Sequence, residues 1–356
     1  MKILYAVQGT GNGHITRARL MAKALHQRTD IQVDYLFSGR PVQAYFDMSV
    51  FKQYSTRKGL SFHVHNGRIQ ILESFRELDF TCAWRDIRTL PITDYDLVIN
   101  DFEPIAAWAA KLAKVPCIDI SHQAALRCQS PVSSDNFFER LLTKYYAPSS
   151  VQLGIHWFHF DQLMIPPFID QSLLHAEQTN SNKTLVYLPF ESLSAINDAL
   201  FPLSERKFEV FHPHIQHDRS SHNIQWRRPK RSEFLAAMKS ANAVIANAGF
   251  ELATECLSLG KPLMVKPLQG QFEQLSNAKL LEAIDAACVF QDLNSEAIED
   301  GLLELKQCRI QFPTDPKGLI DWIISGSWHN PKVLCDELWH QVEYPAHVKA
   351  RLYAYS

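Results

Sequence analysis

Short apolar runs alternate with amphipathic stretches along most of the chain, and this alternation constrains the fold more than any other feature. KILYAV (2–7), ITRARLMAKALHQR (15–28) and IQVDYLFS (31–38) have the patterns of a strand, a helix and a strand. The same order recurs from residue 95 to residue 121. Apolar strands separated by helices predict a parallel sheet that is covered on both faces.

The alternation pauses in HAEQTNSNK (175–183), a polar segment without apolar periodicity, and resumes with TLVYLPF (184–190). We therefore predict two Rossmann-like α/β domains, residues 1–172 and 183–325, facing a central cleft. The 356 residues are enough for both. We predict that residues 326–356 form a helical tail, which either packs on the second domain or crosses back to the first.

Composition excludes several classes of protein. A formal net charge of −2 gives no electrostatic reason to bind nucleic acid. The seven cysteines form no CxxC pair and no metal-ligand spacing, which is typical of free thiols in a reducing compartment. The first apolar run is too short for a signal peptide, and no window approaches the roughly 18 apolar residues of a membrane-spanning helix. We expect a cytoplasmic protein with no bound metal.

One segment favours a contact with the inner face of the membrane. FFERLLTKYY (137–146) mixes aromatic and basic side chains, which suit an anionic membrane surface. The alternative is an amphipathic helix whose aromatic face packs in the core.

The loop GTGNGH (9–14) directly follows the first predicted strand. Its glycines let a ligand approach the main chain, and the free N–H groups of the next helix attract anions. A dinucleotide-binding loop would have glycine at position 14 and an acidic residue at the end of the second strand. Here position 14 is histidine and the second strand ends in Phe37, Ser38 and Gly39, so both features argue against NAD and FAD.

His14 stands at the start of a predicted helix, where a neutral imidazole can accept a proton from a hydroxyl. Asp101 and Glu103 follow another strand at the same sheet edge, and a carboxylate there would orient His14. Arg17, one turn after His14, can face the same ligand. The alternatives are that His14 braces the loop, that Asp101 caps the helix starting near Pro104, and that Arg17 is solvated.

Three other polar motifs have simpler interpretations. His122 and Gln123 follow the strand VPCIDIS at the same edge and are predicted to face the ligand. The histidines of HPHIQH (212–217) have no carboxylate or cysteine nearby, so we expect no metal there. Asp94 and Asp96 directly precede a strand, and we interpret this DxD as a turn.

The stretch NAVIANAGFELATECLSLGKPLMVKPLQGQFEQLSNAKLLE (242–282) carries the strongest motif. Its pattern is strand, turn, helix, strand, loop and helix. The turn before Phe250 presents a second helix N-terminus to an anion. Glu255, six residues after Gly249, can accept both hydroxyls of a ribose, and the polar start of the last helix suits the hydroxyls of a sugar.

This stretch resembles the donor-binding signature of GT-B glycosyltransferases that use nucleotide sugars. It is similar to the family of the lipid II-forming N-acetylglucosaminyltransferase and its uncharacterised relatives. The matching motifs are the glycine turn at Gly249, Glu255, Gly260–Pro262 and Gln274–Asn277–Ala278. GTGNGH matches the N-terminal glycine loop of the family, whose histidine is the proposed base in several members.

The resemblance implies a nucleotide-sugar site in the second domain. Glu255 would bind the ribose, and Glu273 and Gln274 would bind the transferred sugar. The family often has two glutamines where Glu273 and Gln274 stand, which leaves the sugar open. PFES (189–192) replaces a glycine-rich loop, although Ser192 can still donate to phosphate. The donor diphosphate would be held by Asn247, Ala248, Gly249 and Phe250.

The resemblance also implies the reaction. A sugar, for example from UDP-GlcNAc, would move with inversion to an acceptor hydroxyl, free or lipid-linked, with no cofactor and no metal. His14 would be the base and Asp101 its partner. A non-hydrolysing nucleotide-sugar 2-epimerase and a nucleotide-sugar-binding protein without turnover are the alternatives. The acceptor side would be formed by Gly11, Asn12, Gly13, Arg17, Glu103, His122 and Gln123.

Overall fold

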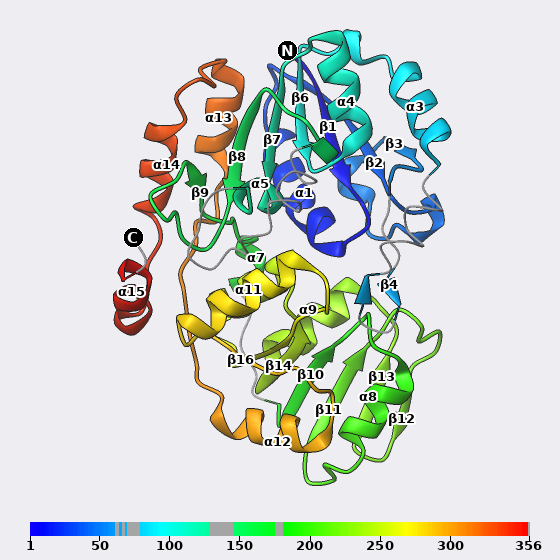
Figure 1. Cartoon of the computed structure of the whole chain (residues 1–356), viewed down its shortest axis with the longest axis vertical. Coiled ribbons are helices and arrows are strands. Elements are labelled where there is room, and N and C mark those ends of the chain that lie inside the picture. Colours follow the sequence, from blue (N-terminus) through cyan, green and yellow to red (C-terminus); the bar gives the residue numbers. More distant parts are fainter. Residues whose placement is uncertain (61–63, 66–67, 70–78, 128–144, 175–180, 355–356) are drawn as a thin grey trace. The chain divides into compact units, whose positions relative to one another are not determined.

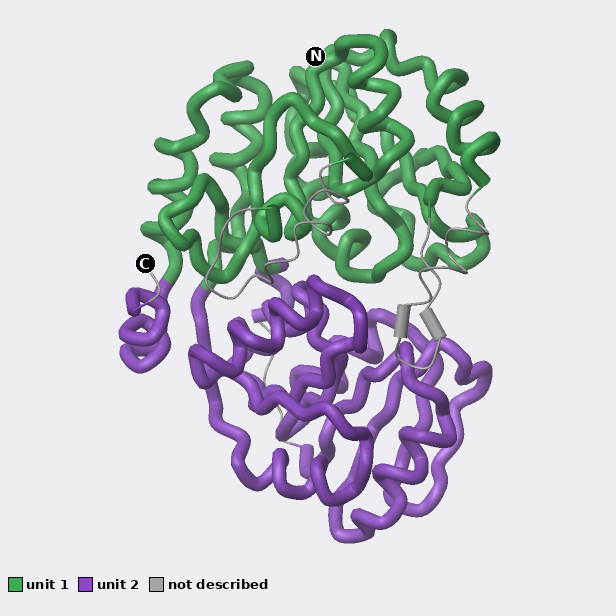
Figure 2. The backbone as a smooth tube through the Cα atoms, in the orientation of Figure 1, with its two compact units in different colours: residues 1–63, 71–169, 312–342 green, residues 64–70, 170–311, 343–356 purple. Residues whose placement is uncertain are grey.

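The computed structural model describes residues 1–60, 64–65, 68–69, 79–127, 145–174 and 181–354. The chain divides into two compact units, which Figure 2 shows in different colours. Unit 1 comprises residues 1–63, 71–169 and 312–342, and unit 2 comprises residues 64–70, 170–311 and 343–356.

Unit 1 is built on a parallel sheet with the strand order β3-β2-β1-β6-β7-β8-β9 (Figure 1). The apolar runs predicted as strands pair directly, with Ile3 of β1 beside Val33 of β2 and Leu97 of β6. The order reverses between β1 and β6, which makes this pair the switch point of the sheet. The strands are β1 (Lys2–Gln8), β2 (Gln32–Ser38), β3 (Tyr54–Arg57), β6 (Leu97–Asp101), β7 (Cys117–Ser121), β8 (Val151–Ile155) and β9 (Met164–Ile165).

The helices of unit 1 cover this sheet and bury its apolar side chains. One core cluster joins Leu4, Leu36 and Val98 of the sheet to Ala106 and Ala110 of α4. Helix α1 begins at Asn12, three residues before the predicted helix, so His14 lies in its first turn. The helices are α1 (Asn12–Leu25), α3 (Phe80–Thr89), α4 (Pro104–Ala113), α5 (His122–Ala125), α13 (Lys317–Ser325) and α14 (Lys332–Trp339), with short 3-10 turns η1 (Val42–Ala44), η2 (Ser49–Phe51) and η3 (Ile92–Asp94).

Unit 2 has a second sheet with the order β12-β13-β11-β10-β14-β15-β16, parallel except for β12. Its switch point lies between β10 and β14. The strands are β10 (Lys183–Tyr187), β11 (Lys207–Phe211), β12 (Arg219–Ser221), β13 (Ile224–Arg227), β14 (Ala243–Asn247), β15 (Leu263–Lys266) and β16 (Cys288–Val289), with a separate hairpin of β4 (Val64–His65) and β5 (Arg68–Ile69). The helices are α7 (Gln171–Leu174), α8 (Leu193–Leu200), α9 (Arg231–Ser240), α10 (Phe250–Leu259), α11 (Phe272–Ala283), α12 (Ser295–Glu304) and α15 (Ala346–Tyr353).

The prediction of two Rossmann-like α/β domains is confirmed, because each unit has its own parallel-dominated sheet and its own helices. The end of the chain differs from the predicted boundary at residue 326. Residues 312–342 already belong to unit 1, where Asp321 of α13 pairs with Arg28 at 2.7 Å and the Trp339 indole donates to the Met164 carbonyl at 2.8 Å. The last helix belongs to unit 2, where Arg351 donates to the Ala283 carbonyl at 3.0 Å.

Two further expectations concern turns and membrane helices. The DxD is a turn: Asp94 ends η3, and the Asp96 carboxylate accepts the Lys2 backbone N–H at 2.7 Å. In the described part of the chain, no helix is long and apolar enough to cross a membrane.

Candidate functional site

The loop after β1 brings the polar start of α1 to the switch point of the unit 1 sheet. Gly9 is set by packing, because a Cβ there would collide with the Tyr45 ring and lie 2.8 Å from the Ser38 carbonyl oxygen. Gly11 is the N-cap residue of helix α1 and has no side chain to cap it. The first-turn N–H groups of α1 therefore point toward the edge of the sheet where ligands bind in this class of fold.

The predicted pair of His14 and Asp101 is formed within unit 1. His14 Nδ1 lies 2.8 Å from Asp101 Oδ1, and the Asp101 side chain is fully buried. A carboxylate only accepts, so the imidazole proton lies on Nδ1 and leaves Nε2 with a free electron pair. This is the arrangement that a general base requires.

Arg17 also binds Asp101, and does so with both arms of its guanidinium. Its Nε donates to Oδ2 at 2.9 Å and its Nη2 donates to Oδ1 at 2.8 Å, while Nη2 lies 3.1 Å from His14 Nδ1. Burial alone would raise the pKa of Asp101, but the charges of Arg17 and His14 outweigh it and hold this pKa below its ordinary value. Arg17 is therefore not a solvated side chain, and its guanidinium binds Asp101 in the protein without ligand.

Of the two side chains at the start of α5, one lies near His14. The Gln123 amide Nε2 is 3.5 Å from His14 Nε2. The His122 ring is buried and donates through Nδ1 to the Ile155 carbonyl at 2.9 Å. Gln123 therefore lies at the imidazole edge that would meet a hydroxyl, and His122 holds β8 in place.

Glu103 performs the capping role that was considered for Asp101. Its carboxylate accepts the backbone N–H groups of Ile105 and Ala106, at 2.9 and 2.6 Å, and the Ser38 hydroxyl at 2.7 Å. The side chain is fully buried, and burial raises its pKa despite these hydrogen bonds. Glu103 is the N-cap of α4, so the interpretation of Asp101 as that cap is wrong.

The remaining residues of the first loop hold its shape. Asn12 Oδ1 accepts from Arg40 Nη1 at 3.1 Å, and Arg40 Nε also donates to the Gly9 carbonyl. Gly11 is the N-cap position of α1, and Gly13 lies in the first turn. Arg40 thus stabilises the path of the loop between Gly9 and Asn12.

In unit 2, the turn predicted to hold a diphosphate lies at the switch point between β10 and β14. Gly249 is the N-cap of α10, and no side chain caps this helix. The φ of Gly249 is −74°, which any residue can adopt, and a Cβ there would meet no atom of the described residues within 4 Å. Glycine is therefore required by neither conformation nor internal packing, and it leaves open space beside the helix N-terminus.

Amide side chains brace this turn and the loop beside it. Asn247 Nδ2 donates to the Lys266 carbonyl and Asn277 Nδ2 donates to the Ala248 carbonyl, both at 3.0 Å. Gln274 Oε1 accepts the Leu268 N–H at 3.0 Å. Asn247, Asn277 and Gln274 thus hold the backbone of the turn and of the loop after β15. Glu273 lies in the first turn of α11.

Glu255 has a partner that the sequence motif did not indicate. Arg231, the first residue of α9, lies with Nη2 3.5 Å from Glu255 Oε1. Burial raises the pKa of Glu255 to about 7, although the Arg231 charge opposes this shift. The signal available in the sequence was the basic run Arg227–Arg231. Within that run, Arg227 pairs with Glu209 and Asp218.

A second ion pair in unit 2 was also not foreseen. Lys266 Nζ lies 2.7 Å from Glu191 Oε1, and each side chain is 9% exposed. Ser192, the next residue after Glu191, caps α8 by accepting the Ala195 N–H at 3.1 Å. Glu191 lies in PFES, the stretch that replaces a glycine-rich loop.

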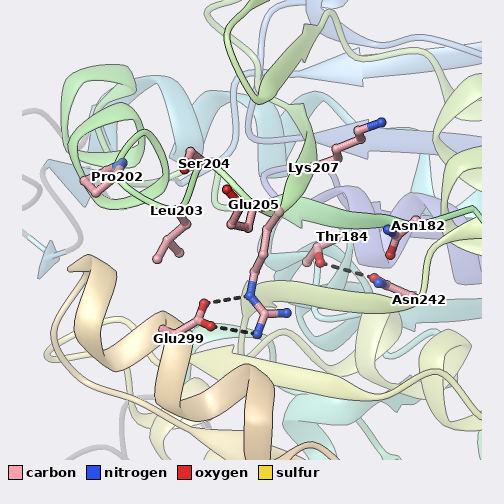
Figure 3. A pocket seen from close by; sticks show the side chains of 10 residues that line it. Asn182, Thr184, Pro202, Leu203, Ser204, Glu205, Lys207, Asn242 and Glu299 are labelled. Carbon is pink, nitrogen blue, oxygen red and sulfur yellow. Dashed lines mark hydrogen bonds and ion pairs between the residues drawn. The ribbon is translucent and has the colours of Figure 1, made fainter.

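Two other features lie apart from these groups. His212 Nε2 donates to the Glu191 carbonyl at 3.0 Å, and among the described residues no three His, Cys, Asp or Glu side chains are grouped as metal ligands. A pocket of about 400 Å³ opens where β10, β11 and β14 begin (Figure 3). The pair Arg206–Glu299, at 2.6 Å, crosses it, and no predicted site residue lines it.

The predicted membrane-contact segment cannot be placed in this site. Its residues 137–144 lie outside the described part of the chain, whereas Tyr146 donates to the Leu60 carbonyl at 2.6 Å.

Comparison with known proteins connects these features to a family. The chain matches the family described as Glycosyl transferase family 1 over residues 1–306. No curated protein matched it.

Among solved structures it is similar to the glycotransferase of kitacinnamycin, at 14% identity over 99% of this chain and 95% of that one, with a TM-score of 0.57. It is also similar to MurG of Acinetobacter baumannii, at 17% identity over 91% and 99% of the two chains, with a TM-score of 0.53. SnogD of Streptomyces nogalater, a glycosyltransferase, matches at 13% identity over 92% and 99%, with a TM-score of 0.54.

The structural matches show a shared GT-B fold, and the match over residues 1–306 covers both sheets. The chain belongs to glycosyl transferase family 1 and is a glycosyltransferase.

Proposed function

We propose that this glycosyltransferase moves a sugar from a nucleoside-diphosphate sugar, with UDP-GlcNAc as the first candidate, to an acceptor hydroxyl with inversion. The observation that carries the proposal is the pair of His14 and the fully buried Asp101, 2.8 Å apart at the switch point of unit 1. We place the donor site in unit 2, because Gly249, the N-cap residue of α10, has no side chain to cap the helix and leaves open space beside it.

The proposed step needs one base and a stabilised leaving group. The acceptor oxygen attacks the anomeric carbon, the bond from that carbon to the diphosphate oxygen breaks, and the acceptor proton passes to His14 Nε2. The diphosphate leaves with the bonding electron pair. Helix N-termini and basic side chains stabilise its charge, so the step requires no metal.

A panel of nucleotide sugars tests the donor. We expect UDP sugars to raise the melting temperature of the purified protein and NAD to leave it unchanged, because a ligand that binds the folded state stabilises it by mass action. Adding EDTA should not reduce the shift. Stabilisation by NAD alone would contradict the proposal. Stabilisation by dTDP sugars and not by UDP sugars would show that the donor carries a different nucleobase.

Product analysis separates transfer from the two alternatives. Incubation with UDP-GlcNAc and either a lipid-linked or a soluble acceptor should release UDP only when an acceptor hydroxyl is present, with an inverted glycosidic bond detectable by NMR. Formation of the 2-epimer without an acceptor would indicate an epimerase. Binding without turnover on any acceptor would indicate a binding protein.

Variants of the His14–Asp101 pair test the base. His14→Ala should lower kcat by roughly 10²- to 10⁴-fold and leave nucleotide affinity within twofold, because general-base catalysis contributes about that much. Asp101→Asn should also lower kcat, because an amide can stabilise the other tautomer of His14. His329→Ala, which removes an exposed histidine, is the control. Full activity in His14→Ala would remove this residue from the mechanism.

A further inference from the structure

The ion pair between Lys266 and Glu191 lies at the switch point of unit 2 and is largely buried. The two charged groups are 2.7 Å apart, and both side chains are 91% withdrawn from solvent. Taking two charges out of water costs free energy that their attraction often only offsets, so buried ion pairs are weak contributors to stability. A buried pair at a ligand-binding edge therefore calls for a functional explanation.

The two side chains of the pair come from either side of β14, the strand that precedes α10. Lys266 ends β15 and is the register partner of Asn247, the last residue of β14. Glu191 follows β10 in a turn closed by its N–H to the Leu188 carbonyl at 3.1 Å. Because β14 lies between β10 and β15, the pair passes over the carboxyl end of β14.

The electrostatics of this place require an anion. The N-terminus of α10 carries partial positive charge, and the Lys266 ammonium adds a full positive charge near it. Glu191 supplies the balancing negative charge in the protein without ligand. An ammonium has three donors, and Lys266 Nζ makes one hydrogen bond with the described residues, to Glu191.

A second buried lysine shows how a purely structural ammonium is held in this fold. Lys261 lies at the opposite end of β15, and its Nζ donates to the carbonyls of Lys239 and Ala241. Its partners are neutral main-chain groups that no ligand can replace. Lys266 differs because its partner is a side-chain carboxylate, which has the same charge sign as a diphosphate.

We propose that Lys266 is a diphosphate-binding residue, held by the Glu191 carboxylate until the diphosphate of the donor takes the place of that carboxylate. This inference rests on the proposed function, because it assigns a residue to the donor site. It makes Glu191 a competitor that keeps the lysine oriented in the free protein and withdraws when the nucleotide binds.

Calorimetric titration with UDP and with uridine tests Lys266, because the two ligands differ only in the diphosphate. Lys266→Met should weaken UDP binding by about 10- to 100-fold, the size of a lost hydrogen bond to a charged group, and leave uridine binding within twofold. Lys207→Met removes the same charge from an exposed position where β11 begins, and should change neither affinity.

Glu191→Gln provides an independent test, should Lys266→Met fail to fold. Removing the competing carboxylate should strengthen UDP binding at least threefold without changing uridine binding. Equal losses for UDP and uridine in Lys266→Met, or unchanged or weaker UDP binding in Glu191→Gln, would overturn the inference. If the wild-type protein binds neither UDP nor dTDP, the proposed function itself fails.

Discussion

At the scale of single residues, Asp101 is shared between a base and a cation. His14 Nδ1 and Arg17 Nη2 both lie 2.8 Å from its Oδ1, and they lie 3.1 Å from one another. If Nδ1 accepted from Arg17, the proton would move to Nε2 and the imidazole could not act as a base. The Asp101 carboxylate accepts from both groups and therefore favours the tautomer of His14 with the proton on Nδ1. Arg17 contributes to this tautomer indirectly, by holding Asp101 in position.

Arg17→Met tests this role through stability. Removing the guanidinium leaves a buried carboxylate with a weaker partner, which should cost about 3 kcal/mol of unfolding free energy at pH 7. The wild-type pKa of Asp101 is held below its ordinary value, so the stability it contributes is present above pH ~3.9 and is lost as pH falls through the folded-state pKa. In Arg17→Met, burial is no longer offset by the Arg17 charge and should raise the pKa of Asp101, so the carboxyl group of the variant takes up a proton between pH 7 and pH 4. The difference in stability between the two proteins should shrink at pH 4 for this reason.

Urea unfolding at both pH values measures that difference. Arg17→Lys, which keeps the charge but cannot bind both carboxylate oxygens, should lie between the wild type and Arg17→Met. An equal loss at pH 7 and pH 4 would mean that Arg17 stabilises the fold by packing and not through the Asp101 charge.

Glu255 predicts a pH dependence of donor binding. Its pKa is raised by burial to about 7, and only the ionised carboxylate can accept both ribose hydroxyls. Uridine affinity should rise close to tenfold per pH unit below 7 and level off above it, with protons released on binding. Calorimetric titrations in buffers of different ionisation enthalpy measure the number of protons released, because the observed binding enthalpy changes with the buffer in proportion to that number.

Two further results accompany this pH dependence. Glu255→Gln should remove the pH dependence and the proton release. In the free protein, the raised pKa means that the Glu255 contribution to stability is largest below pH ~4.3 and declines as pH rises through about 7. A flat affinity profile in the wild type would exclude Glu255 from ribose binding.

At the scale of helices, the starts of α1 and α10 differ from those of α4 and α8. Helix α4 is capped by the Glu103 carboxylate and α8 by the Ser192 hydroxyl, so some of their first N–H groups are already bound. The N-cap residues of α1 and α10 are glycines, which have no side chain to cap the helix. An uncapped helix start costs stability unless another group meets its N–H groups, and a bound ligand can do so.

Gly249→Ala separates a binding role from a structural role. The backbone of Gly249 suits any residue and a Cβ meets nothing, so the free protein should keep its stability or gain a few tenths of a kcal/mol. The added methyl group occupies the open space beside the helix N-terminus, so UDP affinity should fall by tenfold or more.

Gly260→Ala, at the other end of the same helix, is the matched control. Gly260 has a φ of +67°, which alanine adopts poorly, so this variant should lose about 1 kcal/mol of stability and keep its UDP affinity. Unchanged UDP affinity in Gly249→Ala would place the diphosphate elsewhere.

At the scale of the whole molecule, each unit has a core of its own. Val186, Phe208 and Ile245 belong to the core of unit 2, and Leu4 and Leu36 belong to the core of unit 1. The two sheets share the same topology around a switch point, so either could in principle hold a nucleotide. The assignment of the donor to unit 2 is thus a prediction about the molecule as a whole.

Hydrogen exchange with and without UDP tests that assignment. At 100 times the dissociation constant, a ligand adds about 2.7 kcal/mol to the stability of the state that binds it. Protection should therefore increase in residues 188–192 and 247–256, and residues 9–17 should be unaffected by UDP alone. Protection of the first loop in place of the second would reverse the roles of the two units.

The arrangement of strands and helices could be predicted from the sequence because it depends on local patterns. Apolar runs bounded by turns identified β1, β6, β10 and β14, and the observed bounds differ from the predicted ones by at most three residues. The pairing of His14 with Asp101 was also predictable, because parallel strands bring their carboxyl ends to one edge whatever their separation in sequence.

The partners of the other charged groups were not predictable. Arg17 and Glu103 each had several possible roles, because periodicity shows which edge a side chain approaches but not which atom it meets. The Arg231–Glu255 and Lys266–Glu191 pairs join residues 24 and 75 positions apart, and no spacing rule connects them.

The sequence by itself therefore determined two parallel α/β sheets and the two glycine turns, and it offered the His14–Asp101 pair as one of several interpretations. Only the tertiary structure decided which carboxylate caps α4, which one binds Arg17 and which one holds Lys266. The physical reason is that hydrophobic periodicity is read along the chain, whereas the energy of a buried charge depends on groups that folding brings within about 4 Å.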